Sequence, residues 1–240
     1  MSYREHFYGR YTEAQARATQ AEMAEKVAND KAYLKETLSP YLPTVKNATI
    51  VDLGCGYGSA LLMLREAGYT NTSGVDVSPQ QVAVAQALGA HNVSLGSIDD
   101  VLAKRPKVDC FLMMDVIEHL TRSEAINTLT AMHECLNEGG CVILRTPNVD
   151  APFGTVLSFG DFTHELHLNV ISANELFASL SYSSVRVLAV RPHGGPILAR
   201  LLRTLFYVPG MFVQRIRCAI HGVRWSHYLH TSNMLIIAEK

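Results

Sequence analysis

The fold of this 240-residue chain can be predicted from one segment, Thr49-Ile50-Val51-Asp52-Leu53-Gly54-Cys55-Gly56-Tyr57-Gly58-Ser59. An apolar run rich in β-branched residues ends at an acid and then breaks into three glycines at alternate positions. This pattern is typical of a buried parallel strand that turns sharply into a helix. The glycines leave the backbone of the turn open to a ligand.

A second predicted strand, Ser73-Gly74-Val75-Asp76-Val77, also ends in an acid, and one predicted helix separates the two acids. Glycines for close backbone approach, followed by a carboxylate for a ribose, favour an adenosine-containing cofactor. A dinucleotide loop would read G-x-G-x-x-G, but Ser59 takes its last glycine position. Asp52 would repel a pyrophosphate and attract a cationic ligand.

The run D-L-G-C-G-Y-G, at Asp52 to Gly58, resembles motif I of the class I S-adenosylmethionine-dependent methyltransferases. The resemblance covers about residues 45–150 and continues through the segments 95–100, 108–120 and 136–144. The last of these, L-N-E-G-G, is similar to the family's L-x-P-G-G turn, with Glu138 in place of the proline. Ser97 stands where the family often has an acid.

This resemblance implies S-adenosylmethionine as the cofactor. Asp52 is expected to orient its amino-acid end, Asp76 to bind the ribose hydroxyls and Val77 to cover one side of the adenine. The residues Met114 to Val116 are expected to line the methionine moiety. The full set of predicted cofactor-binding residues is Asp52, Gly54, Cys55, Gly56, Gly58, Asp76, Val77, Ser97, Ile98, Asp99, Met114, Asp115 and Val116.

Strands and helices are expected to alternate along the chain, which predicts a parallel sheet covered by helices on both faces. The family resemblance implies a Rossmann-like, doubly wound α/β sheet of order 3-2-1-4-5-7-6 with an antiparallel last strand. We predict one methyltransferase domain over residues 1–240. It comprises an N-terminal helical extension (1–44), a cofactor-binding core (45–190), a basic apolar helical insert (191–231) and the last strand (232–240).

The predicted strands cover residues 48–53, 72–77, 92–95, 108–113, 140–146, 183–190 and 232–238. Helices are expected over residues 12–38, 59–68, 78–88, 121–136 and 172–180. A secretory signal is not expected, because no apolar segment led by Lys or Arg opens the chain. A spanning helix is not expected either, because no stretch approaches about 18 to 20 uninterrupted apolar residues. The five cysteines form no C-x-x-C pair. Free thiols and a cytoplasmic location are therefore expected.

The net charge of −1 hides an asymmetry. No acid occurs between Glu175 and Glu239, a stretch that carries seven arginines and no lysine. Within residues 196–217 arginines alternate with bulky apolar residues, which predicts a pair of basic amphipathic helices. They are expected to contact the inner face of a membrane or to clamp an anionic substrate. A solvated helical hairpin on the sheet edge is the alternative, and nucleic acid is not expected as a partner.

Methyl transfer to a hydroxyl requires alignment of the acceptor and a group that takes its proton. That group should lie at the carboxyl ends of strands four and five. His164 is the first candidate and His119 the second, and a structural role stays open for both. Asp161, His164, Glu165 and His167 could instead hold a divalent metal, but their spacing is not H-E-x-x-H. No metal site is therefore predicted.

Asp115 follows the fourth strand, where amino-methylating nucleic-acid enzymes carry N-P-P-Y, which favours an oxygen acceptor. The segment D-F-T-H-E and the basic insert resemble methyltransferases of bacterial surface-polysaccharide biosynthesis. This resemblance predicts O-methylation of a sugar hydroxyl on an anionic or lipid-linked glycan precursor. The alternatives are O-methylation of a quinone-like or other small aromatic molecule, and a non-catalytic cofactor-binding module tethered to a glycosyltransferase or a membrane.

Overall fold

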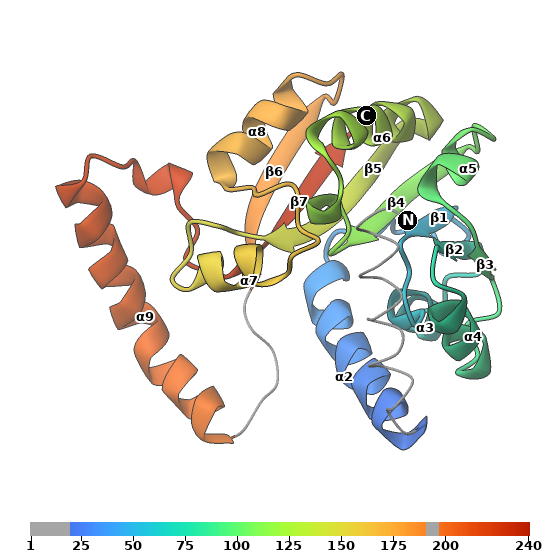
Figure 1. Ribbon diagram of the computed structural model, residues 1–240, viewed down its shortest axis with the longest axis horizontal. Coiled ribbons are helices and arrows are strands. Elements are labelled where there is room, and N and C mark those ends of the chain that lie inside the picture. Colours follow the sequence, from blue (N-terminus) through green and yellow to red (C-terminus); the bar gives the residue numbers. More distant parts are fainter. Residues whose placement is uncertain (1–19, 191–196) are drawn as a thin grey trace.

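The computed structural model describes residues 20–190 and 197–240, which form a sheet with helices on both faces (Figure 1). The first part of the predicted helix 12–38, and residues 191–196 with Arg191, lie outside these ranges. The strands are β1 (Ile50–Leu53), β2 (Thr72–Asp76), β3 (Val93–Leu95), β4 (Val108–Met114), β5 (Leu136–Pro147), β6 (Ser184–Val190) and β7 (Asn233–Glu239). The α-helices are α2 (Gln20–Leu38), α3 (Ser59–Glu66), α4 (Pro79–Ala87), α5 (Ile98–Leu102), α6 (Arg122–Cys135), α7 (Gly154–Gly160), α8 (Val170–Ala178) and α9 (Ile197–Ile220).

The strand order is β3-β2-β1-β4-β5-β7-β6, which confirms the predicted topology. The first five strands run parallel, and β7 pairs antiparallel with both β5 and β6. Asp52 on β1 is in register with Gly74 on β2 and with Leu112 on β4. The order reverses between β1 and β4, so a ligand crevice is expected beyond the carboxyl ends of these two strands.

The strand β4 shows how the sheet is held between its two layers. Phe111 and Met113 face the cluster that contains α6 and α8, whereas Cys110 and Leu112 face the cluster that contains α2, α3 and α4. All four are fully buried, because successive side chains of a strand point to opposite faces and both faces are covered here. The central strands therefore form a stable base for the loops at their carboxyl ends.

Local signals in the sequence fix the helix starts. The Ser78 hydroxyl accepts a hydrogen bond from the Gln81 N–H, and Pro79 opens α4. Thr121 and Glu124 form a reciprocal capping box before α6. The strand β5 begins at Leu136, earlier than predicted, because an irregularity in β4 allows Leu136 to pair with Val108. All five cysteines are free thiols, as expected.

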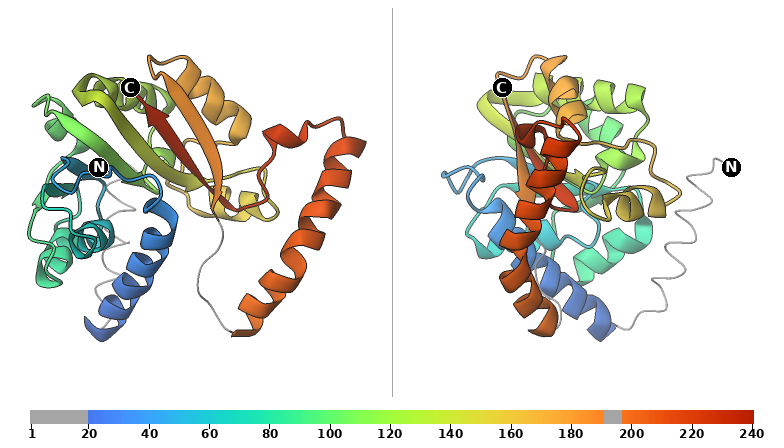
Figure 2. Two further views of the ribbon diagram at one scale, coloured as in Figure 1. Left: turned by 180° about the vertical axis from the view of Figure 1, so that it is seen from behind. Right: turned by 90° about the vertical axis from the view of Figure 1, so that its left-hand side faces the viewer.

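The predicted pair of amphipathic helices is wrong, because α9 is one helix of 24 residues with Pro209 inside it. A proline removes one backbone hydrogen bond, and here the helix continues through it. Figures 1 and 2 show α9 standing apart from the sheet on its β6 side, joined to β7 through the 3₁₀ turn η2 (Trp225–His227). Its exposed apolar residues are Ile197, Leu198, Leu201, Leu202, Leu205, Phe206, Val208, Phe212, Val213, Ile216 and Ile220.

Candidate active site

The glycine turn after β1 forms the floor of the candidate site. Gly54, Gly56 and Gly58 adopt φ angles of 77°, 53° and 74°, which lie in the left-handed region that favours glycine. A Cβ atom added at Gly54 would lie 2.4 Å from Cγ2 of Val116, and one added at Gly58 would lie 2.7 Å from the Cβ of Ala90. The turn is therefore restricted to glycine both by its conformation and by its neighbours.

Asp76 connects this turn to the end of β2. Its Oδ2 accepts a hydrogen bond of 2.8 Å from the Gly56 N–H, and its Oδ1 accepts one of 2.9 Å from the Ser78 N–H. Burial raises the pKa of Asp76, and these backbone donors act in the opposite direction. The expected ribose ligand thus also holds the shape of the glycine turn.

Asp52 is a buried acid whose Oδ1 has no hydrogen-bond partner within the described part of the chain. The side chain is 2% exposed. Burial, followed by the nearby charge of Asp76, raises the pKa of Asp52 to about 7. An orphaned carboxylate oxygen beside an open turn fits a ligand that brings a positive charge or an N–H donor. S-adenosylmethionine brings both, so the residues present fit this cofactor.

The raised pKa of Asp52 predicts that the stability of the ligand-free chain depends on pH. A carboxyl with an ordinary pKa in the unfolded chain and a raised pKa in the folded chain stabilises the fold when protonated. This stabilisation is present at low pH and is lost as pH rises through about 7. We expect the melting temperature of the ligand-free native chain to fall between pH 6 and pH 8. This fall should be larger than the fall measured for Asp52→Asn over the same range.

Ionisation of Asp52 should change cofactor affinity with pH in the direction opposite to its effect on stability. A cationic ligand favours the ionised carboxylate, so its affinity should rise between pH 6 and pH 8, and binding near pH 7 should release a proton. Isothermal titration in buffers of different ionisation enthalpy measures both quantities. The variant Asp52→Asn should bind more weakly and without this dependence. An unchanged pH profile in that variant would contradict the role assigned to Asp52.

The adenine side of the site is partly apolar. Val77 and Leu95, at the ends of β2 and β3, are 58% and 57% exposed, so apolar surface is available there for a flat ring. Ser97 does not present a free hydroxyl. It donates to Asp100 Oδ2 and accepts from the Asp100 N–H, forming a capping box that starts α5. Ile98 and Asp99 follow in the first turn of that helix.

Three further predicted residues surround the turn. Cys55 is buried, and burial followed by the charges of Asp52 and Asp76 raises the pKa of its thiol, so Cys55 fits the tight turn and is no nucleophile. Met114 ends β4, and Val116 packs against Gly54. The cofactor-binding roles of all these residues stay predictions.

Asp115 is held by Arg145, a residue that no motif in the sequence predicted. The Nε atom of Arg145 donates to Asp115 Oδ1 over 2.8 Å, and its second terminal nitrogen donates to Oδ2. Burial acts to lower the pKa of Arg145, but the hydrogen bonds and charge of Asp115 raise it overall. The ring of Tyr33 from α2 lies 5.1 Å from the guanidinium. An arginine at the carboxyl end of an apolar strand was the available signal.

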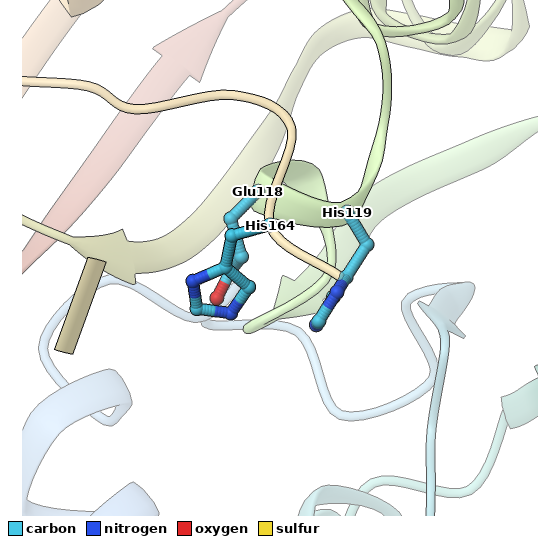
Figure 3. A group of neighbouring side chains, drawn as sticks. All are labelled: Glu118, His119 and His164. Carbon is cyan, nitrogen blue, oxygen red and sulfur yellow. The ribbon is translucent and has the colours of Figure 1, made fainter. Parts of the chain in front are cut away.

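The two histidines predicted as catalytic lie together. The ring centroids of His119 and His164 are 4.7 Å apart, although the residues are far apart in sequence. Figure 3 shows the Glu118 carboxylate beside the imidazole of His164. Burial, followed by the charge of His164, lowers the pKa of His119, so its imidazole is predominantly neutral at pH 7. Glu118 was missed, although it directly precedes His119 in the sequence.

The fold, the glycine turn and the acid that closes it define the class of S-adenosylmethionine-dependent methyltransferases. The match to the methyltransferase-domain family spans residues 21–188, and the chain belongs to this family. The predictions of a methyltransferase and of S-adenosylmethionine as its cofactor are confirmed.

Two solved structures show the same fold. A S-adenosylmethionine-dependent methyltransferase from Archaeoglobus fulgidus is 17% identical with a TM-score of 0.65, and the match covers 91% of this chain and 98% of that one. Magnesium protoporphyrin IX methyltransferase from Synechocystis PCC 6803, solved with bound S-adenosylmethionine, is 16% identical with a TM-score of 0.52, and 90% and 78% of the two chains are covered. At these identities the likeness concerns the fold.

A curated relative has a name that conflicts with the predicted acceptor. The tRNA U34 carboxymethyltransferase of Shewanella loihica is 31% identical over 137 residues. The match covers 52% of this chain but only 39% of that relative. The predictions of a glycan substrate, of a sugar O-methyltransferase and of no nucleic-acid partner are therefore wrong. The resemblance to surface-polysaccharide enzymes finds no support in these comparisons.

The error has a physical cause. Arginines that alternate with apolar residues indicate an anionic partner, and phosphate groups of glycan precursors and of RNA offer the same charge. The motifs that carry the cofactor prediction lie at the end of the sheet that binds S-adenosylmethionine. They hold no information on the molecule that receives the methyl group.

Proposed function

We propose that this chain transfers a methyl group from S-adenosylmethionine to an oxygen atom of an RNA nucleoside, with tRNA as the acceptor. The observation that carries this proposal is the tRNA-modifying name of a relative that matches over half of the chain. An oxygen acceptor is supported by Asp115, which stands where amino-methylating nucleic-acid enzymes carry N-P-P-Y.

In this proposal the cofactor lies along the carboxyl ends of β1, β2 and β4. Asp52 receives its amino group, and Asp76 receives the ribose hydroxyls. Val77 and Leu95 give apolar contact to the adenine. The protein then has little covalent chemistry to perform, because a sulfonium is an excellent leaving group and alignment provides most of the acceleration.

The acceptor oxygen is placed beside the two histidines. His119 follows β4, and the segment between α7 and α8 brings the ring of His164 to 4.7 Å from its ring. In this proposal the transferred methyl group lies next to these two imidazoles. A neutral imidazole can accept the proton that a hydroxyl loses as it attacks.

The test is transfer of label from S-adenosylmethionine carrying a labelled methyl group to tRNA that lacks modifications. Labelled nucleosides, separated after digestion and identified by mass, are the expected result. Asp76→Asn should abolish the label, because it removes the charge that holds the ribose and the turn. Binding of the cofactor without label in any tRNA nucleoside would contradict the proposed acceptor and leave the class intact.

We further propose that α9 attaches the protein peripherally to the surface of a membrane. Among the described residues no helix is both long and apolar enough to cross a bilayer. However, α9 exposes many large apolar side chains, and no acid lies between Glu175 and Glu239. An apolar and basic helix without acids is suited to the interface of an anionic bilayer.

Sedimentation with vesicles tests this attachment. We expect binding to phosphatidylglycerol vesicles, weak binding to phosphatidylcholine vesicles, and loss of binding in Leu205→Glu. The matched control is Ile126→Glu, an exposed apolar position on α6. Equal binding of the two variants would contradict the proposal, as would binding of α9 to RNA with none to either vesicle.

A further inference from the structure

We infer that Glu118, His119 and His164 form a binding site for one divalent transition-metal ion at the acceptor side of the active site. Each residue offers one ligand atom, and these atoms all lie within 4.8 Å of one another. Ligands of one ion with bonds of about 2.1 Å are about 3 to 4 Å apart, so small side-chain adjustments suffice. The three side chains are drawn together in Figure 3.

Two backbone hydrogen bonds fix the segments that carry these ligands. Glu118 and His119 belong to the 3₁₀ turn η1 (Ile117–His119), which follows β4. The Glu118 carbonyl oxygen accepts hydrogen bonds of 2.7 Å from the Glu165 N–H and 3.0 Å from the Leu166 N–H. His164 directly precedes these donors, so its segment is attached to η1. Backbone hydrogen bonds therefore hold the segments of the cluster together, and the three side chains do not meet by a chance approach at the surface.

The hydrogen bonds of the imidazoles select the tautomer that a metal requires. Nδ1 of His164 lies 2.9 Å from the carbonyl oxygen of Ser158, which can only accept, so this nitrogen carries the proton. The remaining lone pair of His164 is then on Nε2. A ligating histidine whose other nitrogen donates to a carbonyl is the usual arrangement around protein-bound metals.

The tautomer of His119 is fixed in a similar way, by a hydrogen bond to the hydroxyl of Thr163. Its Nδ1 lies 2.9 Å from the Thr163 hydroxyl oxygen, and that hydroxyl donates its own proton to Asp161 Oδ1 over 2.7 Å. The hydroxyl must therefore accept from His119, which leaves the lone pair of this imidazole on Nε2 as well. Asp161 thus acts through Thr163 and orients His119, without being a ligand.

Glu118 supplies the negative charge. Its side chain is 2% exposed, and its Oε2 accepts a hydrogen bond of 3.1 Å from the Thr146 hydroxyl. A carboxylate so deeply buried is costly to ionise unless a cation lies beside it. Two imidazoles and one carboxylate form a donor set that suits Zn²⁺, Mn²⁺ or Fe²⁺ and leaves coordination positions open.

This ligand set differs from the one considered from the sequence, which was Asp161, His164, Glu165 and His167. His167, which lies in the same segment as His164, directs its Nδ1 to the Ser158 hydroxyl at 3.0 Å and stacks on Phe159. Asp161 is engaged by Thr163. The candidate ligands are therefore contributed from η1 and from His164, and His167 serves as a matched control.

The experiment measures metal binding by the full chain in the absence of any acceptor. After treatment with a chelator, the protein is titrated with Zn²⁺ by calorimetry and with Co²⁺ by its visible d–d absorption. We expect one equivalent of either ion to bind saturably. Affinity should fall by at least about 10- to 100-fold in His164→Gln and in Glu118→Gln, and should be unchanged in His167→Gln.

Thermal denaturation of the metal-free variants shows whether each remains folded. If Glu118→Gln does not fold, the metal affinity of His164→Gln alone tests the inference. Absence of a saturable first equivalent in the native chain would overturn the inference, as would equal affinities in His164→Gln and His167→Gln. Because no RNA is present, failure here is separate from failure of the proposed acceptor. A histidine whose Nε2 binds a metal ion cannot also accept the proton of the acceptor. Methyl transfer to tRNA by the metal-free native chain, with loss of that transfer in His164→Gln, would therefore overturn the inference and support His164 as the base.

Discussion

Gly54→Ala is expected to reduce cofactor affinity by about 10- to 100-fold and to lower the free energy of unfolding. A side chain at φ 77° carries a conformational penalty of about 1 to 2 kcal/mol. The added Cβ would also lie 2.4 Å from Val116 Cγ2, and overpacking of this kind costs about 1 to 3 kcal/mol. Relief of that clash requires a shift of the turn or of Val116, and both belong to the predicted cofactor site. Each 1.4 kcal/mol lost there lowers the affinity by about a factor of ten.

Gly139→Ala separates these two effects. Gly139 has a φ of 74°, nearly that of Gly54, but nothing lies within 4 Å of the position that its Cβ would occupy. This variant should lose only the conformational part of the stability and bind the demethylated cofactor with unchanged affinity. Urea denaturation and isothermal titration measure the two quantities. Equal effects of the two substitutions on affinity would show that the close approach of Val116 is unimportant.

Arg145→Met is expected to lower the free energy of unfolding by about 1 to 2 kcal/mol, because solvent screens part of the pair. The guanidinium, whose side chain is 17% exposed, makes a two-pronged pair with Asp115, which is 41% exposed. Water therefore compensates part of the Asp115 charge that the substitution leaves unpaired. Asp115 also adopts a φ of 55°, which its bonds to Arg145 help to maintain. Methionine retains much of the side-chain volume, so the loss should reflect charge and hydrogen bonding.

Arg186→Met is the matched control for this substitution. Arg186 pairs with Glu239 at 3.4 Å, but its side chain is 50% exposed and the pair lies at the edge of the sheet. An exposed pair contributes at most about 1 kcal/mol. Urea denaturation of both variants gives the comparison. A loss in Arg186→Met as large as that in Arg145→Met would mean that the two-pronged pairing and the burial of Arg145 add nothing.

The strands of the sheet could be predicted because their signals are local. The apolar runs at 50–53 and 108–114 are each bounded by polar or turn residues, and they appear within a few residues of the expected limits. The course of α9 could not be predicted in this way. Whether Pro209 ends a helix or lies within it depends on how the helix packs, which no local signal encodes.

The residues of the candidate site also fall into those that local sequence signals predict and those that depend on distant partners. Asp52, Asp76 and the glycines between them lie close in sequence, and their positions follow from one strand, one turn and the next strand. Arg145 and Glu118 matter because of partners distant in the sequence, Asp115 and His164 respectively. Such contacts arise only when the carboxyl ends of β4 and β5 are brought side by side, so a single sequence indicates the residues and not their pairing.

The bond from Gly56 to Asp76 has a consequence for the kinetics of cofactor capture. This contact is made between two groups of the protein itself, so the shape of the turn does not depend on a ligand to hold it. A binding site that is already in its bound conformation loses little conformational entropy when the ligand binds. Uptake of the cofactor should therefore follow a single rapid phase in stopped-flow measurements, with a rate proportional to concentration and no plateau.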